Sequence, residues 1–178
     1  MKTYKELLAI AKPFIQASSQ IPHDPLSLCK KLGIVYKCKM QYEEDFNGVN
    51  PLVNFPAILC KKGNGQYIIY IDESSKYWRF YFFHEIAHFL LKHDFDSLEN
   101  EQEANMLACI LIAPMSKLPA SLKSVQDLMY LAGLPIGRAE EYWQALIENG
   151  YGTEKLMSHS VKELLNMSLY ELCVELTK

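Results

Sequence analysis

The chain has 178 residues, of which 49% are hydrophobic and 22% are charged, and its formal net charge is -3. This length and balance are typical of an ordinary folded domain with a core, and they exclude wholesale disorder. The mild negative charge gives no general electrostatic reason to bind nucleic acid, so no direct nucleic-acid binding is expected.

The five cysteines are dispersed along the chain without a C-x-x-C pair. We therefore expect reduced thiols in a reducing compartment rather than a disulfide framework or a thiolate zinc site. The longest apolar run, MLACILIAPM at residues 106–115, is too short to cross a bilayer. The N-terminal segment is interpreted as an amphipathic helix rather than a signal peptide. The sequence thus predicts a soluble, cytoplasmic protein with no membrane segment.

The first part of the chain predicts two helices followed by strands. Apolar residues at helical spacing predict a helix over residues 3–17, and Asp24, Pro25 and Gly33 mark the start and end of a second one. Residues 34–40 alternate in polarity, as a half-buried strand does. Residues 57–60 and 67–71 predict a hairpin across the turn KKGNG. The connection over residues 42–54 is expected to be a loop.

From Ser74 onward the pattern is helical. Ser74 or Ser75 is expected to cap a helix through residue 91, and another helix over about 99–112 should end at Pro114. Residues 124–150 predict two helices joined near GLPIG, and residues 160–176 predict a last amphipathic helix. Glu140 and Glu141 would repel phosphate, which argues against a DNA-reading helix-turn-helix in this pair.

These elements predict an α+β fold in which a small antiparallel sheet packs on a helical majority, with the helix of residues 76–91 at its centre. Residues 1–150 are expected to form one domain. Residues 151–178 are expected to form a helical extension packed on that same domain.

The segment RFYFFHEIAHFLLKH at residues 79–93 carries the clearest chemistry. Residues four apart in a helix lie about 40° apart around the axis and roughly 6 Å along it, so His84 and His88 can share one metal ion. Glu85 lies about 100° from His84, where its carboxylate can take a proton from a metal-activated water without binding the ion. The flanks are apolar, so this helix should be buried and its polar side chains need partners. The alternative is two core histidines paired with carboxylates and no metal.

A third ligand is sought downstream, because zinc hydrolases usually take three protein ligands and leave one position for water. The candidates are Glu99, Glu101 and Glu103. Helix phase favours Glu101, with Asn105 one turn later orienting a ligand. Glu103 lies about 200° from Glu101 and is the weaker alternative, expected to stay in water. A solvated first turn favoured by the helix dipole is the other interpretation of these acidic residues.

His93 lies nine residues after His84, about 180° around the helix. It is expected to be a poor ligand unless the helix has already ended. A role at the surface or at the helix terminus is the preferred interpretation.

Residues 79–93, followed by EQEANMLACILIAP at residues 101–114, resemble the ImmA/IrrE family of zinc metallopeptidases. The resemblance covers about residues 20–150, with its motifs within 79–114. It implies that His84, His88 and Glu101 bind one zinc ion per chain and that Glu85 is catalytic. Two positions depart from the family pattern: Ala113 replaces a frequent methionine, and Lys92 a frequent histidine. Neither departure touches the metal ligands.

This resemblance implies a cytoplasmic, gluzincin-like peptidase with a zincin-like fold, of a kind often encoded by phages or mobile elements. Family members typically act on helix-turn-helix repressors. The expected function is therefore a zinc-dependent metalloendopeptidase whose protein substrate is a repressor-like transcription regulator. The alternative is a catalytically inactive module, zinc-binding or metal-free, that antagonises a regulator by binding alone.

Overall fold

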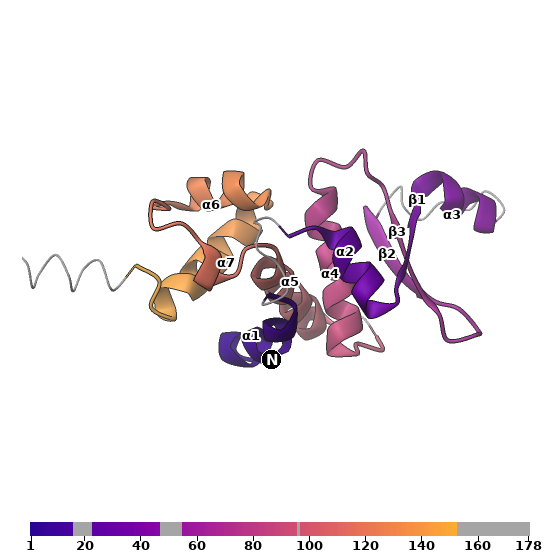
Figure 1. Ribbon diagram of the computed structural model, residues 1–178, viewed down its shortest axis with the longest axis horizontal. Helices are drawn as coiled ribbons and strands as arrows, with labels where there is room; N and C mark the ends of the chain where they lie inside the picture. Colours follow the sequence, from indigo (N-terminus) through magenta and orange to yellow (C-terminus); the bar gives the residue numbers. More distant parts are fainter. Residues whose placement is uncertain (16–22, 47–54, 96, 153–178) are drawn as a thin grey trace, which may run out of the picture. The chain divides into compact units, whose positions relative to one another are not determined.

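The computed structural model describes residues 1–15, 23–46, 55–95 and 97–152, and within them the fold is α+β (Figure 1). Residues 1–143 form one compact unit, and a second unit, 144–178, is described only as far as Gly152. The helix predicted over residues 160–176 lies outside the described residues, as does almost all of the predicted extension over 151–178. The elements are α1 (Tyr4–Ile15), α2 (Pro25–Leu32), β1 (Val35–Cys38), α3 (Lys39–Asp45), β2 (Ala57–Lys61), β3 (Tyr67–Ile71), α4 (Trp78–Leu91), α5 (Leu98–Ile112), the short 3-10 helix η2 (Met115–Lys117), α6 (Val125–Ala132) and α7 (Ile136–Glu148).

Several helix ends are built by the residues that the sequence marked for them. Asp24 caps α2, its carboxylate accepting from the backbone N–H groups of Leu26 and Ser27, and Gly33 ends that helix at a φ of 69°. These caps confirm the second predicted helix. The helix α4 begins at Trp78, later than predicted, because the chain first makes a turn in which the Trp78 N–H donates to the Ser75 carbonyl oxygen.

The sheet is mixed, with the strand order β1-β3-β2. Strands β2 and β3 form the predicted antiparallel hairpin, which pairs Ala57 with Ile71 and Lys61 with Tyr67. Strand β1 pairs parallel to β3, so the prediction of an all-antiparallel sheet is wrong for this strand. The reason is topological: the chain leaves β1 through α3 and the following connection, and β3 rather than β2 becomes its neighbour.

The helix α3 occupies a stretch for which the sequence predicted the end of a strand and a loop. It begins at Lys39, and the Cys38 N–H donates to the side-chain oxygen of Gln41 at 3.0 Å. The ring of Tyr42 packs against those of Phe46 and Tyr70, at centroid distances of 4.4 and 4.7 Å. These contacts with the sheet favour the helix, and alternation along residues 34–40 could not reveal them.

The helix α4 contacts α5 as well as strands β2 and β3, and α5 also contacts α1 (Figure 1). Four side chains of α4 are 0–1% exposed, namely Phe82, Phe83, Ile86 and Ala87. The expectation of a buried, central helix is confirmed. The polar side chains of α4 therefore have to find their partners on α5, on β2 and on the residues that follow α4 itself.

Within the described part of the chain, the cysteines Cys29, Cys38, Cys60 and Cys109 are free thiols. No helix in those residues combines the length and the apolar character that a membrane crossing requires.

Candidate metal centre

The structure brings His84 and His88 of α4 together with Glu101 of α5. The two Nε2 atoms are 2.9 Å apart. The Glu101 carboxylate lies 3.2 Å from the Nε2 atom of His84 and 3.1 Å from that of His88, through its Oε2 and Oε1 atoms respectively. The cluster thus joins the four-residue spacing on α4 to the carboxylate that the sequence favoured on α5.

The three side chains fit a single metal ion, and they could hold one. Bonds of about 2.0–2.1 Å in tetrahedral geometry separate neighbouring ligand atoms by about 3.3 Å, close to the separations in the cluster. The histidine side chains are 12% and 11% exposed, whereas that of Glu101 is 42% exposed. The cluster is therefore enclosed on the α4 side and open beside Glu101, as a site that leaves one position for water must be.

The charge state of Glu101 suits a ligand. Its pKa is lowered because the carboxylate is hydrogen-bonded to His84, an effect that outweighs desolvation by burial. Glu101 lies in the first turn of α5, where the Ser97 hydroxyl caps the helix by accepting from the Asn100 N–H at 3.1 Å. The cap fixes the turn that presents the carboxylate to α4.

One carboxylate oxygen of Glu85 is bound by the sheet. Its Oε2 atom accepts a hydrogen bond of 2.8 Å from the backbone N–H of Leu59 in β2. Glu85 follows His84 directly in α4, and its carboxylate is thus held by the strand that packs on this helix. The candidate metal cluster does not include Glu85, and its role beside a metal ion stays a prediction.

Glu103 is buried, at 3% exposed, so the expectation that it stays in water is wrong. Its carboxylate accepts hydrogen bonds from the Lys2 backbone N–H at 2.5 Å and from the Lys2 Nζ at 2.6 Å. Burial acts to raise the pKa of Glu103, and the Lys2 hydrogen bonds outweigh it, so that the pKa is lowered. Helix phase correctly separates Glu103 from Glu101, but α5 is also covered by the N-terminal segment.

His93 lies at the helix terminus, one of its two expected places, but its side chain is only 7% exposed, so the surface alternative is wrong. The helix α4 ends at Leu91, and Lys92 takes a left-handed conformation with φ 57°. The turn brings the Nδ1 atom of His93 to 3.0 Å from the Nδ1 atom of His88. The sequence signal for this placement is the change from the apolar run FLL to KHD, which marks the end of the helix.

The other acidic candidate and the expected orienting residue take no part in the cluster. Glu99 is exposed and pairs with the N-terminal amine, which agrees with a solvated first turn. Asn105 is half-buried on α5, and none of the contacts of the described residues joins it to the cluster.

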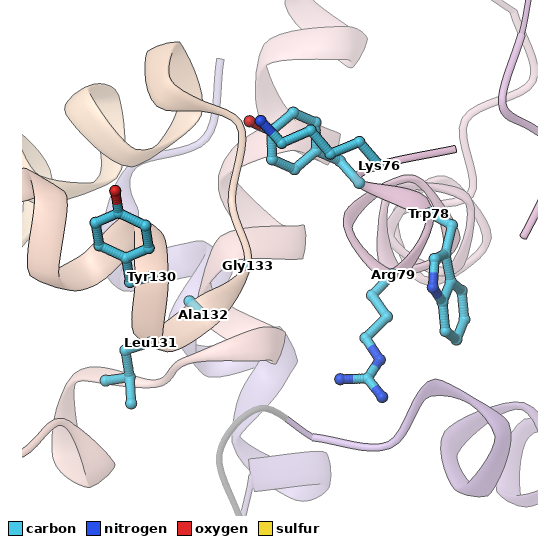
Figure 2. Close-up of a pocket in the computed structure, with 8 residues that line it drawn as sticks. Lys76, Trp78, Arg79, Tyr130, Leu131, Ala132 and Gly133 are labelled. Atoms are coloured by element: carbon cyan, nitrogen blue, oxygen red, sulfur yellow. The ribbon is translucent and has the colours of Figure 1, made fainter. Parts of the chain in front are cut away.

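A cavity of about 330 Å³ lies at the start of α4, and Figure 2 shows the side chains around it. None of the three cluster residues lines it. Lys76 and Arg79 contribute positive charge, each placed over the ring of a neighbouring aromatic residue. The lining residues are Lys76, Tyr77, Trp78, Arg79, Tyr130, Leu131, Ala132 and Gly133. This cavity is therefore separate from the candidate metal cluster.

Comparison of the chain with models of known protein families, with curated proteins and with solved structures finds no match. The support for a function comes from the residues themselves. Two imidazoles and a carboxylate converge on one point, and a second carboxylate stands on the adjacent helix position.

Proposed function

We propose that the protein is a zinc-dependent metalloendopeptidase similar to the ImmA/IrrE family. The observation that carries the proposal is the convergence of His84, His88 and Glu101 within hydrogen-bonding distance of one another. Two histidines and a glutamate are a ligand set that zinc peptidases use with a water in the fourth position. A bound zinc ion would polarise the scissile carbonyl and lower the pKa of the attacking water.

Glu85 is the general base in this proposal. Its carboxylate accepts the proton of the attacking water and then gives it to the leaving amine. The hydrogen bond from the Leu59 N–H holds one carboxylate oxygen, which fixes the side chain without supplying a positive charge. The carboxylate is therefore positioned by the fold before any substrate arrives.

The proposed substrate is a cytoplasmic protein, namely a repressor-type regulator with a helix-turn-helix domain. The motifs shared with the ImmA/IrrE family support this choice. The competing proposal is an inactive module that binds such a regulator and does not cut it.

The variant Glu85→Gln separates these two functions. Its amide oxygen can still accept from the Leu59 N–H, so the fold and the metal cluster should persist, but it cannot take a proton from water. We expect the wild-type protein to cleave a helix-turn-helix regulator encoded in the same genome, and Glu85→Gln to lose at least about 100-fold of that activity. Intact mass and gel analysis of the regulator measure the cleavage.

The matched control is Glu99→Gln, an exposed glutamate on the first turn of α5 outside the cluster, which should cleave as the wild type does. If wild type and Glu85→Gln both abolish DNA binding by the regulator and neither cuts it, the protein acts by binding and the peptidase proposal is wrong.

A further inference from the structure

A line of buried polar groups runs behind His88, away from the metal-binding cluster. The Nδ1 atom of His88 is 3.0 Å from that of His93. The Nε2 atom of His93 lies 3.5 Å from the Oε2 atom of Glu103, whose carboxylate is held by Lys2. We propose that Glu103 and His93 are positioning residues that fix the tautomer and orientation of His88, so that its Nε2 lone pair faces the metal; the inference rests on the proposed zinc site.

The ionised state of Glu103 determines which atoms of His93 and His88 donate and which accept. A carboxylate that receives two Lys2 donors is ionised and can only accept hydrogen bonds. The His93 nitrogen that faces it, Nε2, must then carry the proton. A neutral imidazole has one N–H, so the Nδ1 atom of His93 is an acceptor and the Nδ1 atom of His88 has to be the donor. The Nε2 atom of His88 then carries a lone pair instead of a proton, as metal ligation requires.

The reverse arrangement is unfavourable. If His88 kept its proton on Nε2, the Nδ1 atom of His93 would have to donate, and the Nε2 atom of His93 would become an acceptor. Two acceptors would then face each other at 3.5 Å in a place where both side chains are at most 7% exposed. Apart from the Glu103 contact, that nitrogen has no hydrogen-bond partner among the described residues. Repulsion between unpaired buried acceptors therefore selects the ligating tautomer of His88.

Of the two histidines in the cluster, only His88 has a hydrogen-bond partner for its Nδ1 atom among the described residues. The Nδ1 atom of His84 is buried and lacks a hydrogen-bond partner within the described part of the chain. Partners that accept the second N–H of a metal-binding histidine orient its ring and raise its basicity, and their loss typically costs 10–100-fold in metal affinity. His88 is thus the ligand whose geometry the protein fixes, and the left-handed Lys92 turn is what brings His93 into place.

The test is a zinc competition titration with a chromophoric chelator on purified full-length variants. His93→Phe keeps the ring volume and removes the acceptor, and we expect its zinc affinity to fall about 10–100-fold. His93→Asn places an amide oxygen near the former Nδ1 position, and it should recover most of that loss. Glu103→Gln keeps the shape but can present its amide N–H₂ group to His93, which permits either tautomer. The zinc affinity of Glu103→Gln should fall by about tenfold.

Two controls frame the titration. His23→Phe changes a histidine that is equally buried, at 6% exposed, but lies outside both α4 and α5, and it should leave zinc affinity unchanged. Glu101→Ala removes a ligand and should weaken zinc binding more than any substitution behind His88. The visible spectrum of the cobalt-substituted proteins reports ligand geometry independently. It should change in His93→Phe and return towards the wild-type spectrum in His93→Asn.

The outcomes separate the inference from the site on which it rests. If Glu101→Ala loses zinc while His93→Phe and Glu103→Gln bind it as tightly as the wild type, the positioning role is wrong and the metal site stands. If the wild type itself binds no zinc, the proposed site is wrong. Circular dichroism checks that each variant is folded. Should His93→Phe fail to fold, the near-isosteric Glu103→Gln decides the matter, because unchanged zinc affinity and cobalt spectrum there contradict the inference.

Discussion

At the scale of single residues, Glu103 carries its charge in a place that is only 3% exposed. Its partners are Lys2, which precedes α1, and His93, which follows α4. One carboxylate therefore ties three separate parts of the chain together. Its removal leaves the buried Nε2 atom of His93 without an acceptor and takes away the acceptor of two Lys2 hydrogen bonds.

We predict that Glu103→Ala lowers the free energy of unfolding of the metal-free protein by about 1–3 kcal/mol. The loss should stay below that of a fully buried ion pair because the Lys2 side chain is 41% exposed and can turn to water. Urea denaturation with chelator present measures it. Glu99→Ala is the matched control, an exposed glutamate of the same helix whose removal should change the stability by less than about 0.5 kcal/mol. Equal effects of the two substitutions would contradict this account.

The residues of the candidate metal cluster could be predicted from the sequence, whereas the burial of Glu103 and the place of His93 could not. The four-residue spacing places His84 and His88 on one face, and helix phase picks Glu101 over Glu103 as their neighbour. It cannot reveal that Glu103 is buried, because the covering residue, Lys2, lies 101 positions away in the chain. The place of His93 depends on a single left-handed residue at the end of α4.

At the scale of elements, the end of α4 is unusual because its left-handed residue is a lysine. The Lys92 N–H donates to the carbonyl oxygens of His88 and Phe89 at a φ of 57°. Gly33 has the same role at the end of α2, with a φ of 69°. A left-handed conformation costs an L-residue roughly 1–2 kcal/mol, which a glycine avoids, at some expense in backbone entropy.

We predict that Lys92→Gly raises the free energy of unfolding by about 0.5 kcal/mol and leaves zinc affinity unchanged, since the turn that places His93 is kept. The matched control is Gly33→Ala, which should lower the stability by about 1 kcal/mol. Within the described part of the chain, no atom beyond Gly33 and its immediate chain neighbours lies within 4 Å of a Cβ added there, so the backbone conformation alone is tested. Thermal unfolding of the metal-free variants measures both effects. A destabilised Lys92→Gly would show that the lysine side chain contributes more than its backbone strain costs.

The link between β3 and the first turn of α3 predicts a pH dependence. Asp72 accepts from the Ser74 hydroxyl and N–H and pairs with Lys39 at 2.9 Å. The Ser74 hydroxyl and then Lys39 hold the pKa of Asp72 below its ordinary value of 3.8. As the pH falls, the unfolded chain takes up this proton first, so the stabilisation is present above the ordinary pKa and is lost through the acid range below it.

Asp72→Asn should therefore be less stable than the wild type at neutral pH, with a difference that shrinks in the acid range below the ordinary pKa. Urea midpoints of both proteins across this range measure the difference. A gap that stays constant with pH would mean that ionisation of Asp72 contributes nothing to the fold.

Element-scale prediction from the sequence succeeds where the signal is local. The cap and stop of α2 and the hairpin of β2 and β3 are each set by residues within a few positions of the element. The pairing of β1 with β3 and the formation of α3 are set by contacts across the sheet, such as the packing of Tyr42 on Tyr70. Alternation in residues 34–40 carries no information on those contacts. The predicted strand is therefore too long, and it was predicted to pair antiparallel, whereas β1 pairs parallel to β3.

At the scale of the whole molecule, the cluster connects two helices of the compact unit formed by residues 1–143. His84 and His88 belong to α4, and Glu101 belongs to α5. An ion held by all three would bind the folded chain and not the unfolded one, so it would stabilise the fold by mass action. At a free zinc concentration about 100 times the dissociation constant, the gain is about 2.7 kcal/mol.

The measurement that tests the central claim most directly is the zinc content of the protein after zinc loading and desalting, determined by elemental analysis. We predict one zinc ion per wild-type chain. Little or no zinc should remain in His84→Ala, His88→Ala or Glu101→Ala, while Glu99→Ala should keep the wild-type content. A wild-type protein that retains no zinc, or a Glu101→Ala variant that retains as much as the wild type, would contradict the proposed metal centre.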